Sequence, residues 1–129
     1  MYDEGLSKLH LIAKNYVASL GKGDFDNIPY HDQVILRAPI NPGGSEVPIH
    51  GKETLRTSWW APLPSLVAGT EFISSYTSED NTGVAVEFHC HIKSPQCTLR
   101  IVDRFQIDDE GLITEQENFF DPSALANPS

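Results

Sequence analysis

A carboxylate, Asp103, stands where the sequence pattern places apolar side chains. Residues 97–107 alternate apolar and polar side chains, as do residues 84–92, and this period is typical of strands with one solvent-exposed face. Asp103 falls on the apolar side, between Ile101 and Phe105. A buried carboxylate is unfavourable unless it is hydrogen-bonded, protonated or used in chemistry. We therefore expect desolvation to raise the pKa of Asp103, so that the neutral acid donates a hydrogen bond.

Three polar side chains could act together with Asp103. Tyr16, on the apolar side of a predicted helix, could donate its phenol to a ligand, or it could simply fill the core. Gln116 and Asn118 share the inward side of the last predicted strand. Their amides could orient a ligand carbonyl or hydroxyl, or they could satisfy Asp103 and each other. Tyr16 and Asp103 are therefore the candidate catalytic pair, and the two amides are candidate ligand-binding groups.

The predicted strand pairing gives Asp103 two cross-strand neighbours. A simple turn at residues 108–111 places Gln116 opposite Asp103, and the preceding hairpin places Val86 on its other side. Apolar side chains are expected to complete a binding site for a small, largely apolar molecule. The candidates for this lining are Trp59, Trp60, Val86, Phe88, Ile101, Phe105 and Phe120.

The two tryptophans cannot have the same role. Adjacent helical residues diverge by about 100°, so one of Trp59 and Trp60 is expected to face the sheet. The pattern does not decide which of them lines a cavity and which is an ordinary core residue.

A metal site is not expected at Glu87, His89 and His91. The alternation places all three on the face opposite to Phe88. Side chains two residues apart on a strand are about 7 Å apart, which is wide for chelation without a ligand from another strand. We expect this outer face to meet solvent or a second copy of the chain, and we expect no metal and no cofactor.

The composition excludes several classes of partner. The 129 residues are enough for one domain with a sizeable core, and 40% of them are hydrophobic. A net charge of −9 argues against nucleic acids and anionic membranes, whose binding sites are basic. No apolar run is long enough to span a membrane. Two cysteines without a signal peptide indicate a cytoplasmic protein.

The elements that must hold these residues are helices first and strands afterwards. Apolar residues at helical spacing predict a helix from residue 3 or 4 to Leu20, with Gly21 capping its C-terminus. Asp24 is the expected N-cap of a short helix that ends at Ile28. Further elements are expected as a strand at 33–37, a loop at 39–50, a helix at 51–60 ended by Pro62 and Pro64, strands at 70–78, 84–92, 97–107 and 112–120, and a frayed tail at 122–129.

Together these elements predict an α+β fold. Three N-terminal helices on one face of a curled antiparallel sheet would enclose a cone-shaped cavity. The loop at 39–50 is long for a compact domain, which indicates that it is either functional or mobile.

The layout resembles the superfamily of nuclear transport factor 2, SnoaL-like polyketide cyclases and steroid delta-isomerase, which has a cystatin-like fold. The landmarks are Tyr16-Val17 with Gly23-Asp24-Phe25, then residues 48–53, then Asp108-x-x-Gly111. In steroid delta-isomerase a tyrosine of the first helix and a protonated aspartic acid of the penultimate strand form an oxyanion hole. By local context Tyr16 and Asp103 match these two positions.

The resemblance departs from the isomerase at the catalytic base. That enzyme has an aspartate immediately before a proline after the first strand, whereas Ala38 precedes Pro39 here. His31, Arg37 and His50 are the nearby titratable groups, and none of them is a convincing replacement.

Two functions therefore stay open at the level of sequence. One is an enzyme without a cofactor that binds a small, oxygen-containing molecule and catalyses acid-assisted isomerisation, dehydration or cyclisation. The other is a non-catalytic ligand-binding or dimerisation module. In both cases a homodimer through the outer sheet face is expected.

Overall fold

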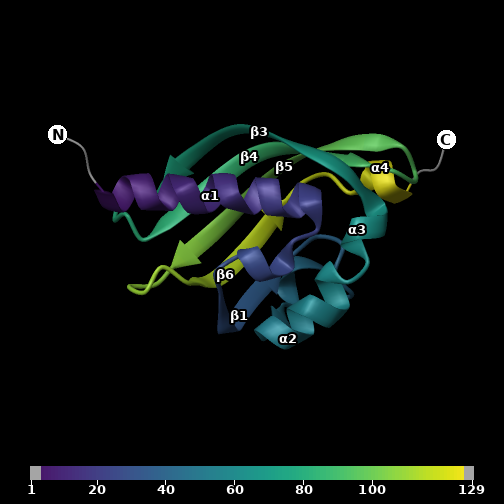
Figure 1. The fold of residues 1–129 in the computed structure, drawn as a ribbon. Helices are drawn as coiled ribbons and strands as arrows, with labels where there is room; N and C mark the ends of the chain where they lie inside the picture. The colour runs from purple at the N-terminus through teal and green to yellow at the C-terminus, as the bar shows by residue number, and fades with distance from the viewer. Residues whose placement is uncertain (1–3, 127–129) are drawn as a thin grey trace.

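A curled six-stranded sheet carries Asp103 and most of the other candidate residues in a computed structural model of the chain, which describes residues 4–126 (Figure 1). The strand order is β2-β1-β6-β5-β4-β3. The strands are β1 (Tyr30–Arg37), β2 (Ile49–His50), β3 (Val67–Thr77), β4 (Gly83–Ile92), β5 (Cys97–Ile107) and β6 (Ile113–Phe119). The predicted α+β class is confirmed, but the sheet is mixed, because β1 pairs with β6 in parallel. The chain between these two strands is long enough for the crossover that a parallel pair requires.

The hairpin of β4 and β5 agrees with the alternation of the sequence. Ile92 pairs with Cys97, and Val86 pairs with Asp103, as predicted. Along β5 the inward residues are buried from Leu99 to Ile107, and the residues between them are largely exposed. This alternation turns Asp103 into the interior.

The β5–β6 register differs from the prediction by two residues. Asp103 pairs with Asn118, and Phe105 is the partner of Gln116. One residue of the difference comes from a longer turn, in which the backbone N of Asp108 donates to the carbonyl of Leu112 at 2.9 Å. The other comes from an irregularity beside Gln106, where the backbone skips one residue of β6. Because the total shift is even, the inward side of β6 is unchanged.

Helix α1 (Glu4–Lys22) crosses one face of the sheet and buries Tyr16 against it (Figure 1). The helix ends two residues later than predicted. Gly23, with φ of +69°, has the left-handed conformation after its last residue, and Gly21 lies inside the helix. A Cβ at Gly21 would lie 2.5 Å from Thr70 Oγ1, which donates a hydrogen bond to the carbonyl of Val17 at 2.7 Å. Gly21 therefore allows α1 to approach β3 closely, and the prediction that it caps the helix was wrong.

The other helical segments are short and partly irregular. They are η1 (Phe25–Asn27), η2 (Gly44–Glu46), α2 (Lys52–Thr54), η3 (Leu55–Trp60), α3 (Leu63–Leu66) and α4 (Ser123–Ala126). The predicted helix at 51–60 begins as α2 and continues as the π-helix η3, in which the backbone N of Ala61 donates to the carbonyl of Arg56 at 3.0 Å. Pro62 follows η3 and is the N-cap residue of a further short helix, α3. A missing N–H is tolerated at this position, so the chain stays helical beyond Pro62.

Two predicted irregular segments contain structure. The loop at 39–50 holds η2 and also β2, which pairs with β1. The tail was predicted to be frayed, but residues 123–126 form α4, and Leu125 packs against the core. Helix α4 lies at the same end of the sheet as α3 (Figure 1). The remainder of the tail, residues 127–129, and the predicted helix start at Asp3 lie outside the described residues.

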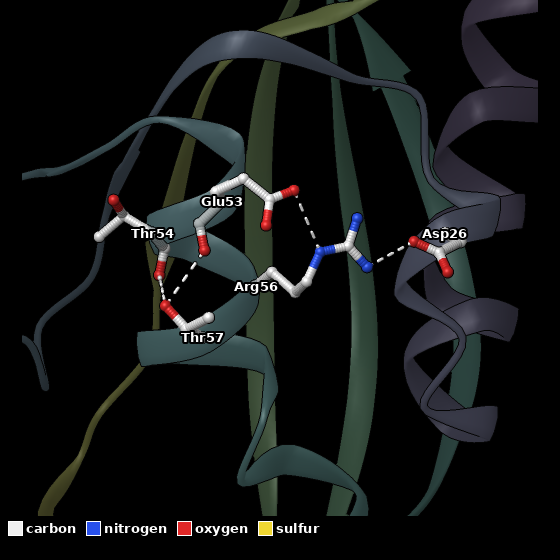
Figure 2. A network of polar contacts seen from close by, with 5 residues as sticks. All are labelled: Asp26, Glu53, Thr54, Arg56 and Thr57. Carbon is white, nitrogen blue, oxygen red and sulfur yellow. Dashed lines mark hydrogen bonds and ion pairs between the residues drawn. The ribbon is translucent and has the colours of Figure 1, made fainter.

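An ion pair fixes η3 against η1 (Figure 2). Arg56 Nη1 donates to Asp26 Oδ1 at 2.6 Å, and its Nε donates to Glu53 Oε1 at 3.4 Å. The guanidinium also lies over the Phe25 ring, 4.6 Å from its centroid. These contacts join the π-helix to η1 at the surface, where an exposed ion pair adds little to stability.

None of the helices described in residues 4–126 is long and apolar enough to cross a membrane.

Candidate functional site

An inner cavity of about 60 Å³ lies between the sheet and the helices, with Asp103 in its wall. Most of its lining is apolar, and the polar groups that reach it belong to Tyr16, Asp103 and Asn118. A buried water needs about 10–15 Å³ by this measure, so the cavity has room for a few waters. A larger ligand requires the apolar side chains around the cavity to move apart.

Asp103 is 1% exposed and is held by two amides of β6. Asn118 Nδ2 donates to its Oδ1 at 2.5 Å, and Gln116 Nε2 donates to its Oδ2 at 3.4 Å. Burial raises the pKa of Asp103 to about 7, although the hydrogen bonds from Asn118, Tyr16 and Gln116 favour the charged form and lower it. The carboxyl is thus balanced between its two protonation states near neutral pH.

A chain of buried hydrogen bonds extends from Asp103 to two tyrosines. Tyr30 Oη donates to Gln116 Oε1 at 2.5 Å, and Gln116 Nε2 donates to Tyr16 Oη at 3.0 Å. Burial, followed by the charge of Asp103, raises the pKa of Tyr16. Tyr30 was not among the predicted residues, because the first strand was predicted to begin at Gln33. Three consecutive polar residues, His31, Asp32 and Gln33, separate Tyr30 from the apolar run that begins at Val34, so no alternation in the sequence could have found it.

Asn118 keeps one polar atom free. Its Nδ2 is engaged with Asp103, but its Oδ1 is buried and has no hydrogen-bond partner among the described residues. Asn118 also lines the cavity. It can therefore accept a hydrogen bond from a ligand beside the Asp103 carboxyl.

The predicted site residues divide into those that line the cavity and those that support it. The lining includes Tyr16, Trp59, Phe88, Ile101, Asp103, Asn118 and Phe120. The remaining four, Trp60, Val86, Phe105 and Gln116, are fully or almost fully buried and do not line it.

The supporting residues are excluded from the cavity by their neighbours. Trp60 packs edge-on against Tyr16 and Phe25, with ring centroids 6.2 and 5.5 Å away. Phe105 packs against Tyr16 at 4.9 Å. The sequence left open which tryptophan lines the cavity. In the structure Trp59 lines it, and Trp60 is a core residue.

Sequence reasoning missed the side chains that close the outer end of the cavity. Ile40 follows β1, Leu63 and Leu66 belong to α3, and Leu125 belongs to α4. All four fall in segments that were predicted to be loop, helix end or tail, where no periodic pattern assigns an inward side.

Among the described residues that line the cavity, Asp103 has a pKa near neutral. The other groups near the catalytic-base position differ. Cys90 also lines the cavity, but burial raises its pKa to about 11. Ala38, at the position of the isomerase base, is fully buried. Arg37 Nη1 donates to the carbonyl of Ser45 at 2.9 Å, and His50 is exposed, so neither faces the cavity.

The histidines of β4 lie on the outer face. His89 Nδ1 is 3.4 Å from Glu71 Oε1, and His91 Nδ1 is hydrogen-bonded to Thr98 Oγ1 at 2.8 Å. Within residues 4–126, no group of three or more His, Cys, Asp or Glu side chains is arranged to hold a metal ion.

One protein family matches most of the chain. Residues 13–116 match the SnoaL-like domain. The chain belongs to the SnoaL-like domain family. The predicted superfamily is thereby confirmed, and this family is compatible with a ligand-binding or catalytic role. No curated protein sequence matches the chain.

Solved structures share this fold at low sequence identity. A steroid delta-isomerase from Pseudomonas aeruginosa is 18% identical, with a TM-score of 0.70 over 92% of this chain and 82% of that one. SalBIII, an epoxide hydrolase/cyclase-like enzyme of pyran ring formation in the polyether salinomycin, is 20% identical, with a TM-score of 0.75 over 95% and 96%.

A third structure was solved with a bound small molecule. It is a Mycobacterium tuberculosis protein in complex with estradiol-17β-hemisuccinate, 13% identical, with a TM-score of 0.73 over 90% of this chain and 95% of that one. At these identities the comparisons show the fold alone.

Proposed function

We propose that this SnoaL-like protein binds a small, largely apolar molecule through one of its oxygen atoms and catalyses its acid-assisted isomerisation, dehydration or cyclisation. The observation that carries the proposal is the buried Asp103 carboxyl in the wall of an otherwise mainly apolar cavity. A carboxyl with a pKa of about 7 can both give and take a proton near neutral pH. Apolar walls strengthen its interaction with a developing charge on the ligand.

Asp103 would act as both acid and base, because the usual base position is occupied by Ala38. In the isomerisation of a β,γ-unsaturated ketone, the neutral acid gives its proton to the carbonyl oxygen, and the resulting carboxylate takes a proton from the adjacent α-carbon. The product is a dienol, and Asp103 is again neutral. Asp103 then gives its proton to the γ-carbon and takes back the proton of the enol hydroxyl, which restores the carbonyl and leaves the acid neutral. Tyr16 would stabilise the oxygen through its hydroxyl.

The relatives support a small-molecule ligand in this cavity. The names of two of them include an isomerase and a cyclase-like enzyme, and the third holds a steroid ester. The second candidate is a non-catalytic binding module in which Asp103 only recognises the ligand oxygen. It is favoured by Gln116 and Asn118, which already satisfy both carboxyl oxygens.

Proton exchange on a simple ketone distinguishes the two candidates. Acetophenone in D₂O would be incubated with the protein, and loss of its methyl protons would be followed by proton NMR. We expect faster exchange with wild type than with Asp103→Asn, while the exposed Asp109→Asn variant behaves as wild type. Binding without exchange, measured by calorimetry, would support the non-catalytic module. Absence of both would contradict the proposal.

We also propose that a second copy of the chain covers the outer sheet face, and that the protein acts in the cytoplasm. Val102 and Phe119 are cross-strand partners on this face and are 38% and 47% exposed. Adjacent exposed apolar side chains give a second copy of the chain surface to bury, which favours association. Arg104, which pairs with Glu115 and Glu117 at 3.5 and 3.2 Å, would lie at the edge of such an interface.

A further inference from the structure

A second, larger hollow adjoins the inner cavity on the outer side of Trp59. This outer groove has a volume of about 500 Å³ and lies between the segment 40–49 and the helical segment 58–66. Ile40, Trp59, Leu63 and Leu66 line both the groove and the inner cavity. The two spaces are therefore separated only by apolar side chains, two of which belong to the short helix α3.

The groove contains one buried polar side chain without a partner. Asn41 lines it and is 6% exposed, yet neither its Nδ2 nor its Oδ1 meets a hydrogen-bond partner among the described residues. Buried polar atoms are paired in the great majority of cases. Both amide atoms are themselves buried, so a molecule in the groove reaches them only when the side chains beside Asn41 move aside, and it would then supply the donor and the acceptor that they lack.

Two hydrogen bonds hold the main chain at Asn41 in place. The Asn41 N donates to the carbonyl of Ala38 at 3.2 Å, and the Asn41 carbonyl accepts from the N of Gly44 at 2.7 Å. Two successive turns therefore fix the main chain on both sides of the residue. Only the Asn41 side chain then has to be ordered by a ligand, which keeps the loss of conformational entropy on binding small.

The rest of the groove favours a neutral and mainly apolar molecule. Ile40 and Val47 are exposed and line the groove, so a molecule in the groove would cover their apolar surface. None of the described residues that line the groove carries a charge. An ionic group would therefore find no counter-charge there.

We propose that the outer groove binds the far end of an elongated, uncharged ligand, and that Asn41 recognises a carboxamide at this end. The near end of the same molecule carries the oxygen that meets Asp103, so this inference rests on the proposed function. A carboxamide offers both an N–H donor and a carbonyl acceptor, which match the two free atoms of Asn41. Asn41 is thus a specificity residue, distant from the reacting oxygen.

The test compares two series of 4-alkylacetophenones whose chains lengthen by one methylene at a time. One series ends in a carboxamide and the other in an isopropyl group of the same shape. Calorimetry would give the dissociation constants for wild type, Asn41→Leu and Ser58→Ala. Ser58 lines the same groove and is exposed, so it serves as the matched control.

In wild type we expect the carboxamide to bind about tenfold more tightly than the isopropyl compound at one optimal chain length, as two additional hydrogen bonds predict. Asn41→Leu should abolish this ratio and leave unsubstituted acetophenone unaffected, whereas Ser58→Ala should keep it. Asn41→Ala should give the same loss, which makes the result independent of how leucine packs.

The outcomes separate the two proposals. If acetophenone binds wild type but the carboxamide ratio is the same in Asn41→Leu, the groove assignment is wrong and the proposed function stands. If no acetophenone binds wild type, the proposed function fails, and this inference fails with it.

Discussion

Asn118 on β6 lies directly opposite Asp103 on β5 and donates to its Oδ1 at 2.5 Å, while its own Oδ1 stays free at the cavity wall. The pair therefore presents an acid and an acceptor side by side. A hydroxyl or enol can accept from the first and donate to the second, whereas an ether can use only one of them. This arrangement favours ligands whose oxygen carries, or acquires, a proton.

The pKa of Asp103 should appear in the pH dependence of stability. The native carboxyl keeps its proton up to about pH 7, whereas the unfolded chain loses it near pH 4. Between these values the native state binds more protons, so the free energy of unfolding falls as pH rises. The contribution is roughly 4 kcal/mol at most, present below about pH 4 and lost by about pH 8.

Urea denaturation across this pH range measures the effect. Asp103→Asn should have a flatter profile than wild type, because an amide does not titrate. Rotation of the Asn118 amide can satisfy the new N–H₂ group with the free Oδ1, so the variant should still fold. Asp109→Asn should follow wild type. Parallel profiles for wild type and Asp103→Asn would show that folding does not shift the pKa of this carboxyl.

Tyr30→Phe should destabilise the protein. The substitution removes the donor to Gln116 Oε1 and leaves that buried oxygen unpaired, which costs about 1–3 kcal/mol. Tyr76→Phe is the matched control, since the Tyr76 hydroxyl donates to Glu87 Oε1 at 3.1 Å on the exposed face. A decrease in unfolding free energy for both variants alike would refute a special role for the buried chain.

Gly21→Ala should also destabilise, although alanine favours helices. Its Cβ would meet Thr70 Oγ1 at 2.5 Å and push α1 away from β3, at a cost of about 1–3 kcal/mol. Gly69→Ala adds a methyl group with no atom within 4 Å and should leave stability nearly unchanged. Thermal unfolding of both variants checks the contrast, and a more stable Gly21→Ala would mean that helix propensity prevails.

The proposed dimer predicts a charge-sensitive interface. Phe119→Glu should convert the protein to monomers in sedimentation-velocity experiments, because it buries a charge opposite Val102. Leu11→Glu, at an exposed position of α1, should remain dimeric. A wild-type protein that sediments as a monomer at all concentrations would exclude the interface.

Sequence periodicity was sufficient to predict which side chains face the interior where a regular strand or helix carries the site. The alternation of β5 placed Asp103 in the interior, and the helical spacing of α1 did the same for Tyr16. Both residues reach the inner cavity because a regular strand or helix fixes the direction of each side chain.

The rest of the site depends on departures from regularity that leave no clear pattern. The longer turn after β5 and the irregularity beside Gln106 together exchange Gln116 for Asn118 as the partner of Asp103. The pattern did not decide which of Trp59 and Trp60, both in the π-helix, lines the cavity, and it did not predict α4, which brings Leu125 to the cavity. Such features arise from tertiary packing, which local periodicity does not contain.

The parallel pairing of β1 with β6 has a consequence for the order of folding. β1 aligns with β6 from Tyr30 opposite Ile113 to Arg37 opposite Glu117, with every other strand of the sheet lying between them in the sequence. β2 is attached to the sheet only through β1. A ribosome-bound chain can form the β3–β4–β5 meander early, but β1 and β2 must wait until β6 has been synthesised. The segment that carries Asn41 is thus among the last to take its place.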